Sequence, residues 1–433
     1  MPDRGARISG SVDPTFLERA RAAAFAVGCA LLFWQYDGAA VDWLFGAIVV
    51  ISVVLMLQRR NGFQLTWPHP LLIVFLAVTV AATLLARGSL IALAITIYLV
   101  VAALAFAAIL RANPGFARSV RIGILIAAVL TLVAVAIGWW ARHYGYEPLY
   151  WLTYDPFRSR GLFKDPNVAG GFLACSYPLA AAFVIRQARA RLPLLLLVTI
   201  ATAVGVGMSF SRMALVVFAL GVLGVMVALP LLGQRRLFAG FLAAAALAGI
   251  VAGGAALRVG LDEFPLWRYQ LQAYDENGRF VVWGYAWDMF RVAPLGTGAG
   301  SFEPRAQADF DAELARETAN PDPTTAVTVT VSAHNTYLRV LVESGVVGFV
   351  AFMTFLISLL VIAVRSISRT NWEWPLAFAL VLVAGLAIDT LHWREFWILA
   401  AVIGGTGLGV RHAVRPQAAT SEPTGSTESR APS

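Results

Sequence analysis

The chain has 433 residues, of which 59% are hydrophobic and 13% are charged, and its formal net charge is +8. Soluble globular proteins carry about 25% charged residues, so this composition argues against a soluble protein and places most of the chain in a lipid bilayer. The positive charge does not indicate nucleic-acid binding, because the basic residues are spread between hydrophobic stretches and not gathered in one patch.

Apolar stretches recur along the chain. A membrane-crossing helix needs about 20 mainly apolar residues, and these stretches predict an all-α polytopic membrane protein with about twelve transmembrane helices. The predicted helices lie at residues 20–36, 40–58, 70–86, 89–110, 120–141, 167–186, 192–210, 212–232, 237–257, 335–364, 374–391 and 395–411. They form one membrane domain, residues 20–411, between a cytoplasmic segment at 1–19 and a cytoplasmic tail at 412–433. The tail is rich in Pro, Ser, Thr and Glu, which is typical of disorder.

The arginines predict the orientation of these helices. One set of connections, which includes both termini, carries most of them, whereas the short connections of the opposite set hold only Arg87, Arg212 and Arg394. Because basic residues accumulate on the cytoplasmic side, both termini are predicted to be cytoplasmic. Two longer connections, at about 142–166 and 258–333, then face outward, and the second is large enough for a small external subdomain.

The longer external connection contains a predicted amphipathic helix at Gly278–Arg291. Apolar residues at helical spacing favour a helix that lies against the bundle or the lipid surface. These residues are Phe280, Trp283, Trp287 and Phe290. Arg279 opens the helix, and its apolar neighbours would hold it near the membrane. The glycine-rich turn that follows, Pro294–Gly300, is only superficially similar to a dinucleotide-binding loop, because it follows a helix and not a strand.

Three cations stand together at the end of the shorter external connection. Arg158, Arg160 and Lys164 directly precede Asp165–Asn167, in which aspartate at the N-cap and proline at the first helical position mark a helix start. The positive end of the helix dipole beside three positive side chains suits a phosphate-bearing ligand. Anchoring of the helix to lipid head groups is the simpler alternative, although these charges run against the positive-inside trend.

A further basic residue lies in the turn Ser209–Arg212. The turn is so short that Arg212 must lie at the outer membrane boundary, and an arginine within a span costs roughly 2.5–3.5 kcal/mol on insertion scales. Ser209 and Ser211 are available as helix caps or hydrogen-bond donors. Snorkelling of Arg212 to the interface explains its position equally well.

His334 and Asn335 are the strongest candidates for a catalytic site. They stand where the long connection re-enters the membrane, at a helix N-terminus, and a neutral histidine there can accept a proton. A lone histidine is more often structural. Here Asn335, Tyr337 and Glu343 continue a polar stripe down the same helix, which favours a functional role.

Metal and nucleotide motifs are missing from the sequence. It holds no HExxH, no paired CxxC and no P-loop, so we expect no zinc site, no ATP hydrolysis and no cofactor. The segment Asp309–Asp311 has the DxD form that nucleotide-sugar transferases use to hold a metal, but its acidic surroundings favour a solvated helix face. Cys29 and Cys175 lie in apolar stretches, where they are expected to be small buried residues without a disulfide.

Taken together, these motifs resemble the O-antigen ligase and polymerase family of bacterial membrane glycosyltransferases. The resemblance covers roughly residues 145–365. It depends on the order and topology of the motifs, since each is weak alone. The matching pieces are Arg158–Asn167, Ser209–Arg212, Arg279 with Trp283, Pro294–Gly300, His334–Tyr337, and Glu343–Gly345 with Gly348.

The resemblance implies a metal-independent, inverting glycosyltransferase of the bacterial inner membrane whose active site faces the periplasm. The family's donor is a glycan on undecaprenyl diphosphate, and its acceptor is lipid A-core in ligases or another lipid-linked repeat in polymerases. It implies that the catalytic residues are His334, Arg279 and Arg212. It assigns substrate binding to Arg158, Arg160, Lys164, Asn167, Ser211, Asn335 and Tyr337. Because both Arg158 and Arg160 precede the glycine here, the resemblance does not say which of them has the family's role.

The ligase is the favoured interpretation, and a polymerase of the same family is the first alternative. A transporter or flippase is the main alternative of another class, and it should show internal repeats, broken helices and ionisable groups buried near mid-membrane. The sequence shows no internal repeat, and its charges, Asp389 included, gather near the outer boundary. A non-catalytic scaffold of a polysaccharide export complex is disfavoured only by the arginines and the histidine.

Overall fold

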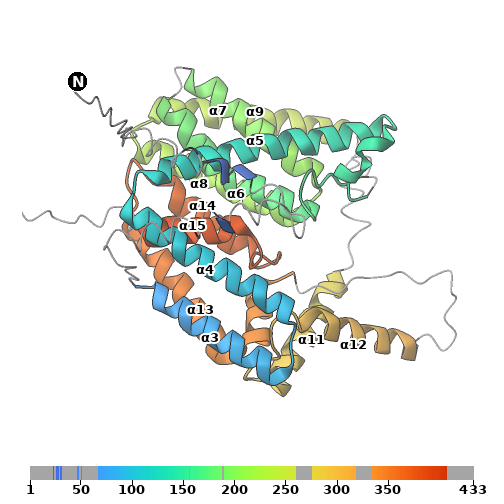
Figure 1. Ribbon diagram of the computed structural model, residues 1–433. Coiled ribbons are helices and arrows are strands. Elements are labelled where there is room, and N and C mark those ends of the chain that lie inside the picture. The colour runs from blue at the N-terminus through green and yellow to red at the C-terminus, as the bar shows by residue number, and fades with distance from the viewer. Residues whose placement is uncertain are drawn as a thin grey trace, which may run out of the picture.

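The computed structural model describes residues 67–155, 157–187, 190–259, 276–317 and 334–406, and positions 23, 26–28, 30–31, 46–47 and 50. Within these ranges, side chains 248–249, 251–259, 276–281 and 310–317 are not described. The described residues form helices, and their only β pairing is an isolated bridge between Thr153 and Ser159 (Figure 1). The predicted all-α fold is therefore confirmed.

The helices follow the predicted spans closely. They are α3 (His69–Ala86), α4 (Leu90–Ala112), α5 (Phe116–His143), the short 3-10 helix η2 (Glu147–Leu152), α6 (Pro166–Gln187), α7 (Arg191–Met208), α8 (Arg212–Leu231), α9 (Arg235–Val259), α11 (Glu276–Val292), α12 (Phe302–Glu317), α13 (Thr336–Arg365), α14 (Glu373–Ala384) and α15 (Arg394–Thr406). Seven of those described, α3 to α8 and α13, are long and apolar enough to cross a membrane. The chain is thus a polytopic membrane protein.

Several predicted segments are not described by the structure. The predicted helices at 20–36 and 40–58 lie almost wholly outside the described residues, as do the N-terminal segment at 1–19 and the tail at 412–433. The total of about twelve helices stays a prediction that rests on hydropathy.

One predicted span was too long. The stretch 374–391 was expected to be a single helix, but α14 ends at Ala384. Gly385 follows, and the polar residues Asp389, Thr390 and His392 then occur within a few positions, so the apolar pattern stops. The chain forms a loop at residues 385–393, hereafter the α14–α15 loop, before α15 begins.

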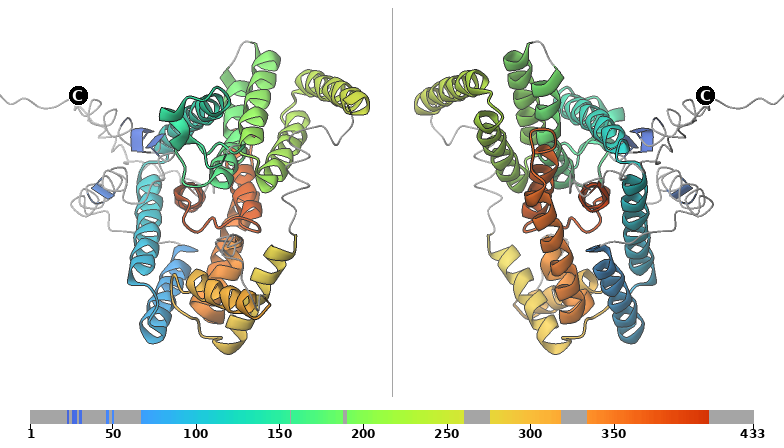
Figure 2. Two further views of the ribbon diagram at one scale, coloured as in Figure 1. Left: turned by 90° about the vertical axis from the view of Figure 1, so that its right-hand side faces the viewer. Right: turned by 90° about the vertical axis from the view of Figure 1, so that its left-hand side faces the viewer.

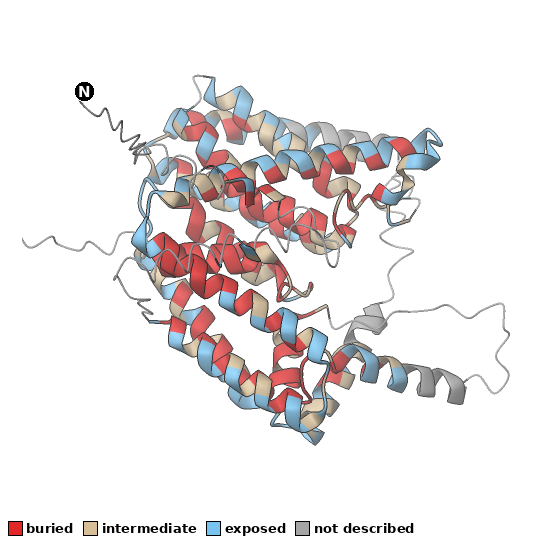
Figure 3. Cartoon of the chain, in the orientation of Figure 1, coloured by how far each residue is buried: buried red, intermediate tan, exposed pale blue. Residues whose placement is uncertain are grey.

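The short helices α14 and α15 lie in the middle of the molecule. Figure 2 shows them between α5 to α9 on one side and α3, α4 and α13 on the other. α14 packs against α6 and α8, α15 packs along α4, and α13 packs along α3. Buried residues concentrate on α6, α14 and α15 (Figure 3). The outer helices instead expose apolar side chains such as Leu223 and Val227 of α8, as expected for a surface that meets lipid.

A buried ion-pair cluster marks one end of this bundle. Glu373, at the start of α14, is fully buried, and its carboxylate accepts hydrogen bonds from Arg186 at 2.6 and 2.7 Å and from Arg121 at 2.5 Å. The cluster joins α14 to the end of α6 and the first turns of α5. We call this the clamp end. The other end, where α6, α8 and α13 begin, is the site end, on the right of Figure 1.

Candidate functional site

The start of α6 is built as the sequence predicts. The Asp165 carboxylate accepts a hydrogen bond from the Asn167 backbone N–H at 2.6 Å, and the Asp165 carbonyl accepts from the N–H groups of Val168 and Ala169. Pro166, which has no N–H to lose, is the first residue of the helix. The positive end of the α6 dipole therefore lies at the site end, directly after Arg158, Arg160 and Lys164, which we call the cationic segment.

The turn between α7 and α8 opens a second helix at the same end. The Ser211 hydroxyl accepts a hydrogen bond from the Ala214 N–H at 3.3 Å and so caps α8. Phe210 reaches this turn with a left-handed φ of 49°. Arg212 is the first residue of α8 and is exposed. A guanidinium at this position lies beside the positive end of the helix dipole. A bound anion would be attracted by the guanidinium and by the helix end together.

Arg158 joins these two helix starts. Its Nε donates to the Ser209 carbonyl at 3.3 Å, and its Nη2 donates to the Asn167 side-chain oxygen at 3.0 Å. The neighbouring Ser159 N–H also donates to the Met208 carbonyl at 3.0 Å. The structure therefore brings Arg158 and Asn167 together with the Ser209–Arg212 turn, which is about 50 residues away from Arg158 in the sequence.

Arg160 has a different environment from Arg158. Its Nε and Nη2 donate to the Trp151 carbonyl at 3.1 and 3.0 Å, and its Nη1 donates to the Lys164 carbonyl at 3.5 Å. These bonds fold the connection back on itself, whereas those of Arg158 cross to α6 and the α7–α8 turn. The two arginines that the sequence leaves equivalent are thus distinguished by their partners.

The first turn of α13 carries the candidate base. The Asn335 side-chain oxygen accepts hydrogen bonds from the N–H groups of Tyr337 and Leu338 at 3.0 and 3.1 Å, so Asn335 is the N-cap. Its neighbour His334 is half-buried and has a φ of 43°, a left-handed conformation that is uncommon for a residue with a side chain. His334 therefore stands just outside the helix, directly before its N-cap, with a left-handed backbone.

The polar stripe on α13 differs from the predicted one in one member. Tyr337 turns away from it toward α14, where its hydroxyl donates to the Leu382 carbonyl at 2.6 Å. The residue that lies between Asn335 and Glu343 on the same helix face is Arg339, which is buried. The signal for it was available, because Asn335, Arg339 and Glu343 follow one another at intervals of four residues.

The α14–α15 loop adds two titratable residues that the sequence did not assign to the site. Asp389 accepts a hydrogen bond from Arg339; burial raises its pKa, but Arg339, His392 and the Leu391 N–H together bring the pKa below its ordinary value. The pKa of His392 is also lowered, first by burial and then by Arg339. The lowered pKa favours the uncharged imidazole, in which one ring nitrogen can accept a hydrogen bond.

His392 also connects the two halves of the site end. The charged groups that act on its imidazole include Glu303 of α12 and Lys164 of the cationic segment, as well as Arg339 and Asp389. The α6 side and the α13 side of the site end thus lie within electrostatic range of each other. Glu303 and Lys164 are both exposed, so this region is polar and accessible.

The external segment is helical where the amphipathic helix was predicted. α11 spans Glu276–Val292 and includes Arg279, although the Arg279 side chain lies outside the described ones. Its packed face is made by Ala286 with Val282, Tyr285, Met289 and Phe290. Trp287 was expected on the face that contacts the bundle or the lipid. Its side chain is 52% exposed, so the bundle leaves about half of it uncovered.

The turn after α11 is built into a break in α13. At Gly345 the helix has φ 66° and ψ −176°, which frees backbone groups of the preceding turn. The Thr297 and Gly298 N–H groups donate to the Val342 and Glu343 carbonyls at 2.9 and 3.0 Å. Gly296 allows this approach, because a Cβ there would lie 2.8 Å from the Glu343 carbonyl oxygen. Gly296 therefore allows close backbone packing against α13. Gly298 and Gly300 instead pack against the end of α3 and the start of α4, where a Cβ would lie 2.9 Å from Thr83 Cα and 2.6 Å from Ala92 Cβ.

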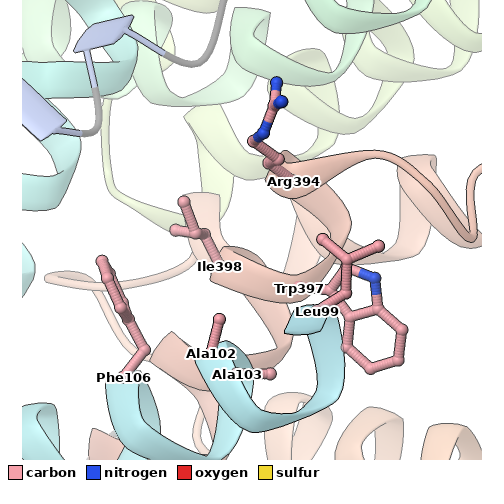
Figure 4. A pocket seen from close by; sticks show the side chains of 7 residues that line it. All are labelled: Leu99, Ala102, Ala103, Phe106, Arg394, Trp397 and Ile398. Carbon is pink, nitrogen blue, oxygen red and sulfur yellow. The ribbon is translucent and has the colours of Figure 1, made fainter. Parts of the chain in front are cut away.

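Two hollows beside the short helices α14 and α15 differ in what they could hold. The one between α4 and α15 has a volume of about 10 Å³, and Figure 4 shows Arg394 pointing away from its apolar side chains. It has room for about one water molecule. The other is an open groove of about 460 Å³ between α13 and α14, lined by Tyr337, Met353, Leu382, Val383 and Leu386. This groove is apolar and large enough for part of a lipid chain.

Comparison with known families supports the resemblance. The sequence model of the O-antigen ligase family matches residues 195–353. The matched segment is less than half of the chain. It contains the Ser209–Arg212 turn, Arg279 and the first half of α13, and it leaves out Arg158–Asn167 and the α14–α15 loop. Comparison with curated proteins gives no match.

Proposed function

We propose that this protein transfers a glycan from a polyprenyl diphosphate, undecaprenyl diphosphate in bacteria, to an acceptor hydroxyl at the outer face of the inner membrane. The observation that carries the proposal is the junction of two helix N-termini, α6 and α8, through Arg158, at the same end of the bundle as His334. Aligned backbone dipoles and guanidinium groups at one place are suited to a diphosphate.

The reaction is a single displacement at the anomeric carbon of the donor sugar. His334 accepts the proton of the acceptor hydroxyl, whose oxygen forms the new bond to that carbon. The bond from the carbon to the diphosphate oxygen breaks, and the negative charge moves onto the leaving diphosphate. Positive groups placed where this charge develops lower the barrier. No nucleotide is needed, since the sugar–phosphate bond is already activated, and we assign the neutralisation of the diphosphate to cationic side chains and not to a metal ion.

We assign the leaving diphosphate to Arg212, Arg279 and Arg158. Between the two arginines of the cationic segment, Arg158 is favoured, because its guanidinium lies between the starts of α6 and α8. Arg160 instead braces the connection through Trp151. Lys164, Asn167 and Ser211 complete the diphosphate side. Asn335 borders the acceptor side, and Tyr337 lines the groove between α13 and α14, which we assign to the lipid chain of the donor.

The groove between α13 and α14 supports a lipid-linked donor. It begins at Tyr337, two residues beyond the N-cap of α13, and it continues to Met353 in the following half of the helix. A chain bound along it would place a diphosphate head at the site end. Such a surface fits a polyprenyl tail, whose burial is favourable along its whole length.

The identity of the acceptor distinguishes a ligase from a polymerase. We favour a ligase that attaches the glycan to lipid A-core, with a polymerase that extends another lipid-linked glycan as the alternative. The two use the same donor chemistry and differ in what supplies the attacking hydroxyl.

The proposal is tested in proteoliposomes that contain the purified protein, a glycan on polyprenyl diphosphate and either lipid A-core or a second lipid-linked glycan. Mass spectrometry of the lipid extract should show glycan joined to one acceptor and free polyprenyl diphosphate, in EDTA as in its absence. Arg212→Ala and Arg279→Ala should raise the KM for the donor and slow the reaction, and lysine at either position should rescue only partly. Activity that disappears in EDTA and returns with manganese would contradict the mechanism.

A transporter is the second candidate, and two observations favour it. The first is the break in α13 at Gly345, where the backbone is not helical. The second is a carboxyl buried within the bundle. Glu395 of α15 is buried and accepts a hydrogen bond at 3.3 Å from Ser176, about midway along α6. We expected the charges to gather near the outer boundary, and this carboxyl departs from that expectation. Intramembrane carboxyls of this kind often carry protons in transporters. Movement of the donor across the vesicle membrane without transfer of its glycan would favour this candidate.

A further inference from the structure

Arg339 is a buried cation one turn inside α13. Its side chain is 7% exposed, and Nη1 donates a hydrogen bond to Asp389 Oδ2 of the α14–α15 loop. Its Nε lies 3.3 Å from Glu343 Oε1, yet these two atoms are not aligned for a hydrogen bond, so their contact is an ion pair alone. One arginine thus stands between two carboxylates, one from its own helix and one from the loop.

The same loop is tied to the first turn of α13 just above this ion pair. The Thr336 N–H donates to the Gly385 carbonyl at 2.9 Å, the Thr390 N–H donates to Thr336 Oγ1 at 2.7 Å, and the Thr336 and Thr390 hydroxyls lie 3.0 Å apart. His334 precedes this turn by two residues. Its left-handed backbone conformation leads directly into the residues that the loop holds.

Glu343 connects Arg339 to the external segment as well. The carbonyl of Glu343 accepts from Gly298, in the turn that follows α11. Arg339 therefore contacts the loop on one side and, through Glu343, the segment that carries Arg279 on the other. Burying an arginine in a membrane helix costs free energy, and one guanidinium does not neutralise two carboxylates. Packing alone therefore does not explain why an arginine occupies this position.

We propose that Arg339 is a positioning residue, which holds the α14–α15 loop against the first turn of α13 and thereby orients His334 for proton transfer. The role rests on the proposed function, in which His334 is the base. Arg339 touches neither substrate nor reacting atoms. Its loss should therefore change how well His334 is aimed and leave the binding of the donor diphosphate largely unaffected.

Arg339→Lys tests this role, because lysine keeps the charge but cannot reproduce the two-sided contact of a guanidinium. We expect kcat for transfer to fall about 10–100-fold, with the donor KM changed less than about twofold. Arg121→Lys is the matched control, since Arg121 is also paired with a buried carboxylate, but at the clamp end. It should lower thermal stability and leave kcat unchanged. Wild-type kcat in Arg339→Lys, or an equal loss of kcat in Arg121→Lys, would overturn the proposal.

A second measurement does not need transfer activity. In a background without Cys29 and Cys175, the pair Thr336→Cys and Thr390→Cys should form a disulfide readily, because the two hydroxyls lie 3.0 Å apart. Adding Arg339→Met should slow this cross-linking about tenfold as the loop loosens. Unchanged cross-linking would refute the proposal. If the wild-type protein transfers no glycan while Arg339→Met still slows cross-linking, that result would refute the proposed function and would still establish that Arg339 fixes the position of the loop.

Discussion

At the scale of the residue, the proposed mechanism depends on His334. If His334 is the general base, His334→Ala should lower turnover by about 10²–10⁴-fold, the usual range for a positioned acid–base group. The donor KM should change little, because the arginines and not the histidine hold the diphosphate. Initial rates in proteoliposomes measure both quantities. His143→Ala is the control, since His143 ends α5 at the site end but belongs to none of the motifs. Near-normal turnover in well-folded His334→Ala would show that another residue is the base.

Single residues also show how far the sequence could predict the site. Asp165, Ser211 and Asn335 were predictable as helix starts, because caps obey local rules. The sequence could not predict that Arg158, and not Arg160, bridges α6 and α8. This depends on which carbonyl each guanidinium contacts after folding. His392 was overlooked for the same reason, because its charged neighbours come together only in the folded protein. The place of Arg339 on the polar face of α13 was visible in its four-residue spacing from Asn335 and Glu343, but its pairing with Asp389 was not.

At the scale of the element, hydropathy predicted the long helices and was less informative about the short ones. A helix exposed to lipid is apolar over its whole length, so its ends are visible in the sequence. α14 and α15 are enclosed by other helices, and the break between them is set by polar contacts with α13. The boundary at Ala384 was marked in the sequence by Gly385 and the polar residues that follow, but Leu386, Ile388 and Leu391 continue the apolar pattern around them, so the predicted span 374–391 ran beyond it.

The Glu373 cluster should be important for the stability of this arrangement. Glu373→Gln leaves two arginines at the clamp end without their counter-charge, and breaking a buried pair in this way costs about 3–5 kcal/mol. We expect a clearly lower melting temperature in detergent, measured by intrinsic fluorescence. Asp288→Asn is the control, because the Asp288–Arg291 pair is exposed and exposed pairs contribute about 0–1 kcal/mol. Equal melting temperatures for Glu373→Gln and Asp288→Asn would contradict the role of the cluster.

The α14–α15 loop should make stability sensitive to acid. The pKa of His392 in the folded protein lies below its ordinary value of 6.5, so the unfolded chain takes up the proton more readily. The free energy of unfolding should then fall as the pH drops below about 6.5, because the unfolded state binds more protons than the folded state. His392→Gln should flatten this dependence in melting curves recorded between pH 5 and about pH 8. A slope unchanged by the substitution would rule out His392 as its source.

At the scale of the whole molecule, the orientation in the membrane remains a prediction from the arginines. Both termini should be cytoplasmic, with residues 258–333 outside. Single cysteines at Gln307 and Ser421, in a protein without Cys29 and Cys175, test it with a membrane-impermeant thiol reagent applied to whole cells. We expect labelling at 307 and not at 421. The reverse pattern would place the site end on the cytoplasmic side, where no periplasmic acceptor could reach it.

The most direct test of the whole account is the configuration of the bond that the protein forms. If the acceptor oxygen attacks the anomeric carbon while the diphosphate leaves, the new glycosidic bond must have the opposite anomeric configuration to the sugar on the donor. NMR of the product from the reconstituted reaction, made from a donor of known configuration, determines this. We predict an inverted product and one polyprenyl diphosphate released for each bond formed. A retained configuration, or release of polyprenyl diphosphate with free glycan and no acceptor product, would contradict the proposed mechanism.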